Sequence, residues 1–248
     1  MENLGFYISK LSVKGKDLQP AELSFEKGFN LITGLSDTGK SYAFSCLNFM
    51  LGQESQPKSI PESTGYSDVY LEIKTYTDDV FSLYRKFSSK SYILKKCAID
   101  DFHKSNTFKE LKLKHDKDND DNISSFLLSL CGLKDVVLKK SKSENVSLSF
   151  RHLRKLTFIP EDRIITENSP FYSTLQNTNQ TTEQFLLFYL LTGIDAKDIL
   201  LFEDEKVRKG RISGQLDFIE NQIKKVATQL DELSLLKDQD KINSFHNR

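Results

Sequence analysis

The segment Gly34–Ser41 constrains this chain more than any other part of its sequence. It reads Gly-Leu-Ser-Asp-Thr-Gly-Lys-Ser and matches the pattern G-x-x-x-x-G-K-[ST]. Glycine at Gly34 and Gly39 lets the backbone wrap an anion with its amides pointing inward, which a side chain at either position obstructs. A loop of this kind connects a strand to the amino-terminal end of a helix. The segment therefore predicts a phosphate-binding loop in an α/β fold.

The residues on either side of the loop fit that context. Phe29–Thr33 is a compact apolar run, which we expect to be the strand that leads into the loop. Ser41–Leu51 places its apolar residues at a helical spacing and is followed by Gly52, so we expect a helix there. The positive end of that helix faces the phosphates of a ligand in the loop.

The loop predicts a nucleotide-binding site. Lys40 is expected to reach the β- and γ-phosphate oxygens as a mobile point charge, and the Ser41 hydroxyl is expected to ligate Mg²⁺. The residues expected to bind the nucleotide are Gly34, Leu35, Ser36, Asp37, Thr38, Gly39, Lys40, Ser41 and Tyr42.

The remaining pattern predicts an antiparallel sheet and then helices. Alternating apolar residues predict strands at 6–8 with 11–13, 21–25, 68–77, 80–87 and 91–98. Helical spacing predicts helices at 123–133 and 181–191, and residues 147–159 are expected to form a helix followed by a strand at Leu156–Ile159. The polar residues 53–65 and the charged residues 104–122 are expected to be loops.

The last quarter of the chain predicts one long helix. From Lys206 to Lys241 there is no proline, and apolar residues recur at alternating intervals of four and three. This is the spacing of a coiled-coil seam, and an amphipathic helix packed on a globular core is the alternative. The seam consists of Ile212, Leu216, Ile219, Ile223, Val226, Leu230 and Leu233.

Charge and hydropathy limit the function classes. The chain has 35 Lys+Arg and 35 Asp+Glu, so no net charge attracts nucleic acid to the whole molecule. Two local basic runs, Lys134–Lys142 and Arg151–Lys155, make DNA a candidate partner. No apolar run is long enough to span a bilayer, and the first residues do not have the pattern of a signal peptide. We therefore expect a cytoplasmic protein with no membrane partner.

The order of these elements resembles the N-terminal half-head of SMC/RecN-type ATPases, the ABC-class family of Rad- and SMC-like proteins. The resemblance rests on the hairpin, the run Phe-Asn-Leu-Ile-Thr-Gly at 29–34, the loop, the helix ending Asn-Phe-Met-Leu-Gly at 48–52, the β-rich lobe and the coil. The residues Ser-Asp-Thr inside the loop are also similar to SMC-like ATPases of bacterial defence systems.

The resemblance implies an α/β P-loop NTPase half-head with an antiparallel β lobe, a helical segment and a C-terminal coiled-coil helix. The half-head is expected over residues 1–203, with the loop at 34–41, the β-rich lobe at about 66–100 and the helical lobe at about 123–195. The coiled-coil arm is expected to start at 204 and to continue through 248.

The resemblance also implies a function. ATP and Mg²⁺ bind at Lys40 and Ser41, a C-terminal half-head or a second ATPase head completes the site, and a second coil pairs with the arm. Head engagement then serves DNA transactions such as repair, chromosome maintenance or phage defence. The family places a glutamine after a strand that precedes its helical lobe. Pro160-Glu161-Asp162 stands at that place, so Glu161 is the candidate metal ligand, with Asp162 left open.

No complete catalytic set is expected in this chain. Ile199–Glu205 resembles a Walker B strand and Ser213–Gln215 resembles an ABC signature, but they occur in the reverse of the family's order. ATP hydrolysis is therefore expected only when a C-terminal half supplies these parts. The alternatives are a non-catalytic coiled-coil interaction module and a self-contained P-loop kinase or GTPase.

Overall fold

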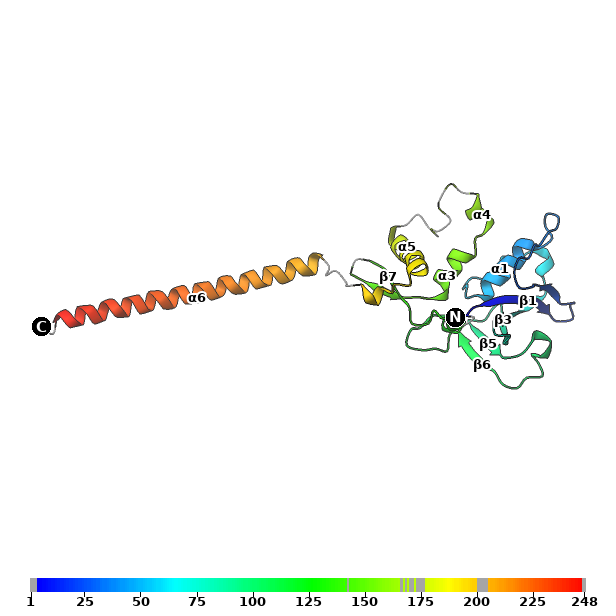
Figure 1. The fold of residues 1–248 in the computed structure, drawn as a ribbon, viewed down its shortest axis with the longest axis horizontal. Helices are drawn as coiled ribbons and strands as arrows, with labels where there is room; N and C mark the ends of the chain where they lie inside the picture. Colours follow the sequence, from blue (N-terminus) through cyan, green and yellow to red (C-terminus); the bar gives the residue numbers. More distant parts are fainter. Residues whose placement is uncertain are drawn as a thin grey trace. The chain divides into compact units, whose positions relative to one another are not determined.

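The computed structural model describes residues 4–141, 143–165, 167, 169, 172, 177–199 and 205–246. Within the two long C-terminal helices, side chains are described for 180–192 and 208–229. The chain divides into two compact units, residues 1–141 with 145–199 and residues 142–144 with 200–248. Figure 1 traces their elements.

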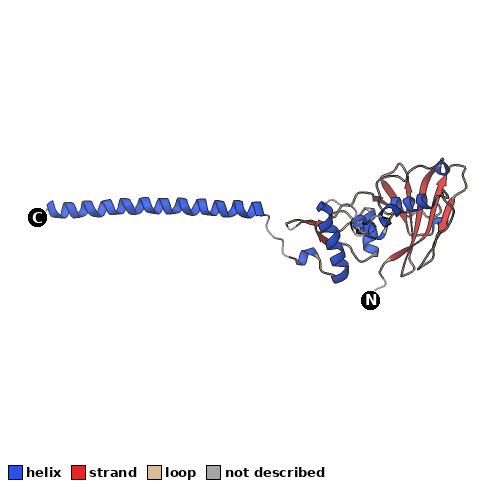
Figure 2. Ribbon diagram, turned by 90° about the horizontal axis from the view of Figure 1, so that it is seen from above, coloured by secondary structure: helices blue, strands red, loops and turns tan. Residues whose placement is uncertain are grey.

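Within the described residues, a six-stranded sheet forms the centre of the first unit (Figure 2). Its strands lie in the order β2-β1-β3-β4-β5-β6, and each neighbouring pair is antiparallel. The strands expected at 6–8 with 11–13, 21–25, 68–77, 80–87 and 91–98 are confirmed. Strand β6, by contrast, lies in the segment expected to be a charged loop. The bounds are β1 (Phe6–Gly15), β2 (Ala21–Ser24), β3 (Tyr66–Thr75), β4 (Val80–Lys86), β5 (Ser91–Lys95) and β6 (Lys109–Lys112).

The two faces of this sheet bury different layers. Because side chains alternate along a strand, Leu71 and Ile73 of β3 point to one face and Tyr70 to the other. Leu71 and Ile73 pack in the main core, with helix α1 (Lys40–Met50), whose Cys46, Phe49 and Met50 are buried. Tyr70 packs with Ile99 and Phe102 in a second cluster. The sheet therefore fixes α1 against one of its faces.

The other elements of the first unit lie between and after these strands. They are η1 (Pro61–Ser63), η2 (Ile99–Asp101), α2 (Ile123–Leu130), β7 (Val137–Lys139), β8 (Asn145–Ser147), α3 (Phe150–Thr157), α4 (Glu161–Ile164), α5 (Asn177–Thr192) and η3 (Ala196–Asp198). The expected helices at 123–133 and 181–191 are confirmed by α2 and α5. Strands β7 and β8 form a separate antiparallel pair.

Two expected strands are wrong. Phe29–Thr33 has no strand assignment and pairs with no described strand, so its backbone lacks the neighbour that a strand requires. Leu156–Ile159 is not a strand either, because α3 continues through Thr157. A capping box between Ser149 and His152 starts α3. Leu153, the next residue of the helix, is buried.

The second unit contains helix α6 (Glu205–His246), so the long helix expected from 206 to 241 is confirmed. Ile212, Leu216, Ile219, Ile223 and Val226 are each between 42% and 62% exposed. The side chains of Leu230 and Leu233 lie outside the described residues, and pairing of the seam stays a prediction. Among the described residues, no helix is both long and apolar enough to cross a membrane.

Candidate functional site

The two glycines of the loop are required for different physical reasons. Gly39 has φ +82° and ψ 7°, a left-handed conformation that L side chains rarely adopt. Gly34 is limited by space instead, because a Cβ at this position would lie 2.9 Å from Oγ1 of Thr38. Asp37 is also left-handed, with φ +62°. The backbone therefore forms the tight loop that the sequence predicts.

Lys40 folds back over the loop. Its Nζ donates to the carbonyl oxygen of Gly34 at 2.8 Å and to that of Leu35 at 2.5 Å. The hydroxyl of Thr38 donates to the same Leu35 carbonyl at 2.8 Å. The ammonium is therefore held within the loop. Gly34, Leu35 and Thr38 are exposed to solvent, and Lys40 is half-buried.

The amino-terminal end of α1 is open to an anion. No side chain caps this end, and its first turn carries no acidic residue. The first amides of a helix lack partners inside the helix and carry the positive end of its dipole. Ser41 lies in this turn, is exposed, and its hydroxyl makes no hydrogen bond to a described residue. Together these groups can hold a phosphate chain and its counter-ion.

The segment that enters the loop is apolar and exposed. The side-chain amide of Asn30 fixes the preceding turn, since it accepts from the Glu26 amide at 2.9 Å and donates to the Glu26 carbonyl at 2.8 Å. Phe29 within this turn is 90% exposed, and after it Leu31 is 74% exposed and Leu35 is 82% exposed. Exposed large apolar side chains in one extended run indicate a surface that another element covers.

Glu161 follows a segment that runs along α1 toward the loop. Arg154 of α3 donates to the carbonyl oxygen of Asn48 at 3.3 Å. Four residues later, the ring of Phe158 lies 5.7 Å from that of Phe44, which is four residues nearer the loop than Asn48. The two segments are therefore antiparallel here, and the chain advances toward Ser41 as it approaches Glu161. Glu161 itself is exposed at the start of α4, and its role as a metal ligand stays a prediction.

Tyr42 follows Ser41 in the first turn of α1. Its side chain packs against the core, and burial raises the pKa of its phenol. It lines a cavity of about 340 Å³ that begins at Thr38 and Gly39 and is bounded by Leu11, Val13 and Leu23 of the sheet. Tyr42 thus lines a mostly apolar hollow beside the loop, and its expected contact with the nucleotide stays a prediction.

A buried arginine that the sequence analysis did not single out anchors the other end of α1. Arg85 of β4 is 1% exposed. Its Nη1 donates to the carbonyl oxygens of Phe49 at 2.7 Å and of Gln53 at 2.8 Å. The one sequence signal for its burial was its position two residues after the apolar Leu83, because residues two apart in a strand point to the same face of the sheet. Arg85 fixes the helix that presents the loop.

Of the two catalytic look-alikes, one is helical in the described residues. The Walker B-like stretch at 199–205 lies mostly outside the described residues. Ser213–Gln215 lies inside α6, where the amides are hydrogen-bonded along the helix and are not free to bind a phosphate.

The described groups fit a nucleoside triphosphate with Mg²⁺. A side chain at Gly34 would crowd Thr38, the cation of Lys40 is already held in the loop, and the open helix end supplies further donors. A family model described as an AAA domain matches residues 1–246. No curated protein matches the chain.

Proposed function

The chain belongs to the AAA domain family, and on that premise we propose that it is the ATP-binding N-terminal portion of an SMC-like ATPase head. The family identifies a nucleotide-binding domain of the ATPase type in a mixed α/β fold, and its members generally bind ATP with Mg²⁺. The finer assignment draws support from the loop, the antiparallel lobe that follows α1, and the long helix α6.

The geometry of the loop carries this proposal. The motif residues are adjacent to an uncapped helix end, and Lys40 needs only to exchange its bonds to Gly34 and Leu35 for phosphate oxygens. Ser41 and Glu161 would hold the magnesium ion, which neutralises charge on the β- and γ-phosphates. The apolar cavity beside Tyr42 would hold the base or the ribose.

The exposed segment 29–35 supports the proposal of an incomplete head. A strand from a C-terminal half-head would pair with Phe29–Thr33 and cover Phe29 and Leu31, and would bring the missing catalytic residues to the loop. A second ATPase head would then close over the nucleotide, and the seam of α6 would pair with a second coil. Head engagement would drive DNA transactions in repair, chromosome maintenance or phage defence.

One observation favours a second candidate function. The exposed apolar residues of α6 would serve equally in a non-catalytic module that only pairs with a partner coil. The two functions differ in whether the loop binds nucleotide, so one measurement separates them.

The test is Mg²⁺-dependent binding of a fluorescent ATP analogue to the full chain, comparing Lys40→Ala with the wild type. Loss of a charge-assisted contact of about 1.5–3 kcal/mol should weaken binding by roughly 10- to 150-fold. Lys58→Ala is the control, since Lys58 is an exposed lysine in the segment that follows α1, with no ion pair to a described residue. Equal affinity of Lys40→Ala and the wild type would reject the ATPase proposal and leave the interaction module.

A further inference from the structure

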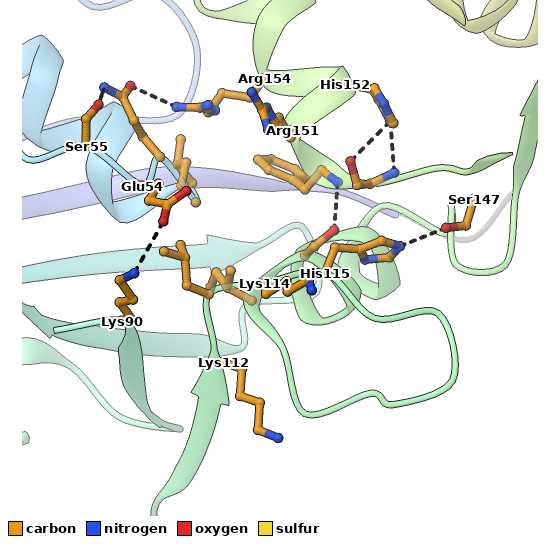
Figure 3. Close-up of a pocket in the computed structure, with 18 of the residues that line it drawn as sticks. Glu54, Ser55, Lys90, Lys112, Lys114, His115, Ser147, Arg151, His152 and Arg154 are labelled. Atoms are coloured by element: carbon orange, nitrogen blue, oxygen red, sulfur yellow. Dashed lines mark hydrogen bonds and ion pairs between the residues drawn. The ribbon is translucent and has the colours of Figure 1, made fainter. Parts of the chain in front are cut away.

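A large cleft opens at the carboxyl end of α1, away from the phosphate loop. Its volume is about 1200 Å³, and it lies between the residues that follow α1, the end of β6 and the start of α3 (Figure 3). The 11 residues of α1 separate it from the loop by roughly 16 Å, at 1.5 Å per residue. The cleft is therefore a second site and not an extension of the first.

The walls of the cleft are cationic. Arg151 and Arg154 of α3 lie on one side, and Lys90 and Lys114 come from the sheet side (Figure 3). The one carboxylate among the described lining residues is Glu54, which pairs with Lys90 at 3.5 Å. A chain with no net charge thus gathers positive charge in one hollow.

Two of these cations have no structural role in the described part of the chain. Arg151 and Lys114 are exposed, and neither makes an ion pair or a side-chain hydrogen bond to a described residue. Arg154 differs, because its Nη1 donates to Oε1 of Gln53 at 3.0 Å. Even so, the Nε of Arg154 is buried without a hydrogen-bond partner among the described residues.

The lowered pKa values of two groups at the cleft indicate a positive electrostatic potential there. Burial, followed by the charges of Lys155 and Arg151, lowers the pKa of His152 to about 4. Burial and then Arg151 also lower the pKa of Arg154. Glu183 pairs with Lys155 at 3.6 Å. Like charges this close repel one another, and a bound anion relieves that repulsion.

The floor of the cleft is apolar, with Leu51, Ile123 and Phe150 among its lining residues. Cationic walls over an apolar floor suit a ligand that combines phosphates with less polar groups. Of the two basic runs in the sequence, Arg151–Lys155 contributes to this cleft. In the other, Lys134 pairs with Asp120 at 2.6 Å and Lys142 lies outside the described residues.

We propose that this cleft is a second phosphate-binding site, in which Lys114 and Arg151 contact the phosphate groups of a ligand that the loop does not hold. The shared chemistry is a row of phosphates, supplied either by the backbone of a single nucleic-acid strand or by a free polyphosphate. A volume above the roughly 300–1,000 Å³ typical of small-molecule pockets favours the strand.

The test compares the full chain with the double variant Lys114→Glu/Arg151→Glu, in a Lys40→Ala background that silences the loop. The probes are a fluorescent single-stranded 12-mer and inorganic tripolyphosphate, the latter by competition and by calorimetry. Charge reversal at two contacts should weaken binding at least about 100-fold, at roughly tenfold per contact. For the strand, the salt dependence should fall by about 1.4 in log–log slope, or about 0.7 per phosphate contact.

Lys16→Glu is the matched control, because Lys16 is exposed, lies in the turn after β1, and makes no ion pair in the described part of the chain. If the 12-mer binds more tightly than tripolyphosphate, the cleft is a site for a nucleic-acid strand, and if tripolyphosphate binds more tightly, it is a site for a free ligand. Either result supports the proposal when the double variant loses binding and Lys16→Glu keeps it. Equal loss in Lys16→Glu, or unchanged binding in the double variant, overturns it. Binding of the ATP analogue by Lys114→Glu/Arg151→Glu with Lys40 intact shows that the fold and the loop survive, so the cleft and the proposed ATPase function fail independently.

Discussion

Replacement of Arg85 by leucine should destabilise the first unit by about 3 kcal/mol. The guanidinium makes four hydrogen bonds, from Nη1 to the Phe49 and Gln53 carbonyls and the Tyr92 hydroxyl and from Nε to the Ser89 carbonyl. It also lies 3.6 Å from the centroid of the Phe49 ring. Leucine removes all of these contacts while it fills much of the volume.

The magnitude follows from which acceptors lose their partners. The Phe49 carbonyl keeps the Tyr92 hydroxyl, which donates to it at 3.0 Å. The carbonyls of Gln53 and Ser89 lose their Arg85 donors, at a cost of about 1–3 kcal/mol each when buried. A lost cation–π contact adds about 1 kcal/mol, and relief from burying a charge offsets part of the total.

Urea denaturation followed by far-ultraviolet circular dichroism measures this change. A loss of about 3 kcal/mol corresponds to a fall in Tm of roughly 6–12 °C for a unit of this size. Lys86→Leu is the control, since Lys86 is the exposed neighbour on the same strand and should change stability by less than about 0.5 kcal/mol. An Arg85→Leu variant as stable as the wild type would refute the reasoning, because the desolvation of the charge would then equal everything its hydrogen bonds contribute.

Three other changes test particular parts of the structure. The pKa of His152 is lowered to about 4 from 6.5, so the unfolded chain binds the proton first and stability should fall by up to about 3 kcal/mol between pH 6.5 and 4. His152→Gln should flatten this profile in unfolding titrations, and an unchanged profile would contradict it. Gly39→Ala should lower the free energy of unfolding by roughly 1–2 kcal/mol, because of the left-handed backbone alone. Gly39→Asn should lower it by less, since asparagine tolerates this conformation better. Equal losses in the two variants would contradict this explanation and indicate a steric clash instead. Ile219→Asp should reduce self-association measured by light scattering, if the α6 seam pairs two copies, whereas an unchanged mass would exclude that pairing.

Local sequence patterns predicted the parts of the fold that local chemistry determines. Gly39 requires a left-handed backbone and α1 has helical spacing, and both are encoded within a few residues of the loop. The strand at Phe29–Thr33 was predicted wrongly because apolar character favours a strand only when a neighbouring strand supplies hydrogen bonds. Strand β6 was missed for the opposite reason, since its Lys-Glu-Leu-Lys sequence has little apolar pattern and pairs through a partner on β5.

Sequence patterns could not predict the cleft. Its cations come from Lys90, Lys114 and Arg151, which are far apart in the chain and meet only after the sheet and α3 have packed. The basic run at Arg151–Lys155 marked one wall, but no spacing rule connects it to the other. Arg85 was missed because a single arginine in a strand has the same appearance whether it faces solvent or the core.

The two ends of α1 differ in a way that should be visible in amide hydrogen exchange. At its carboxyl end, Arg85 ties the carbonyls of Phe49 and Gln53 to the sheet, so these turns should exchange slowly with or without ligand. At its amino end, Gly39 starts the helix without a cap, and the amides of the first turn should exchange quickly until a phosphate covers them. The carboxyl end of the helix should therefore exchange slowly in all states. Ligand-dependent protection of its amides should be confined to the residues around Lys40.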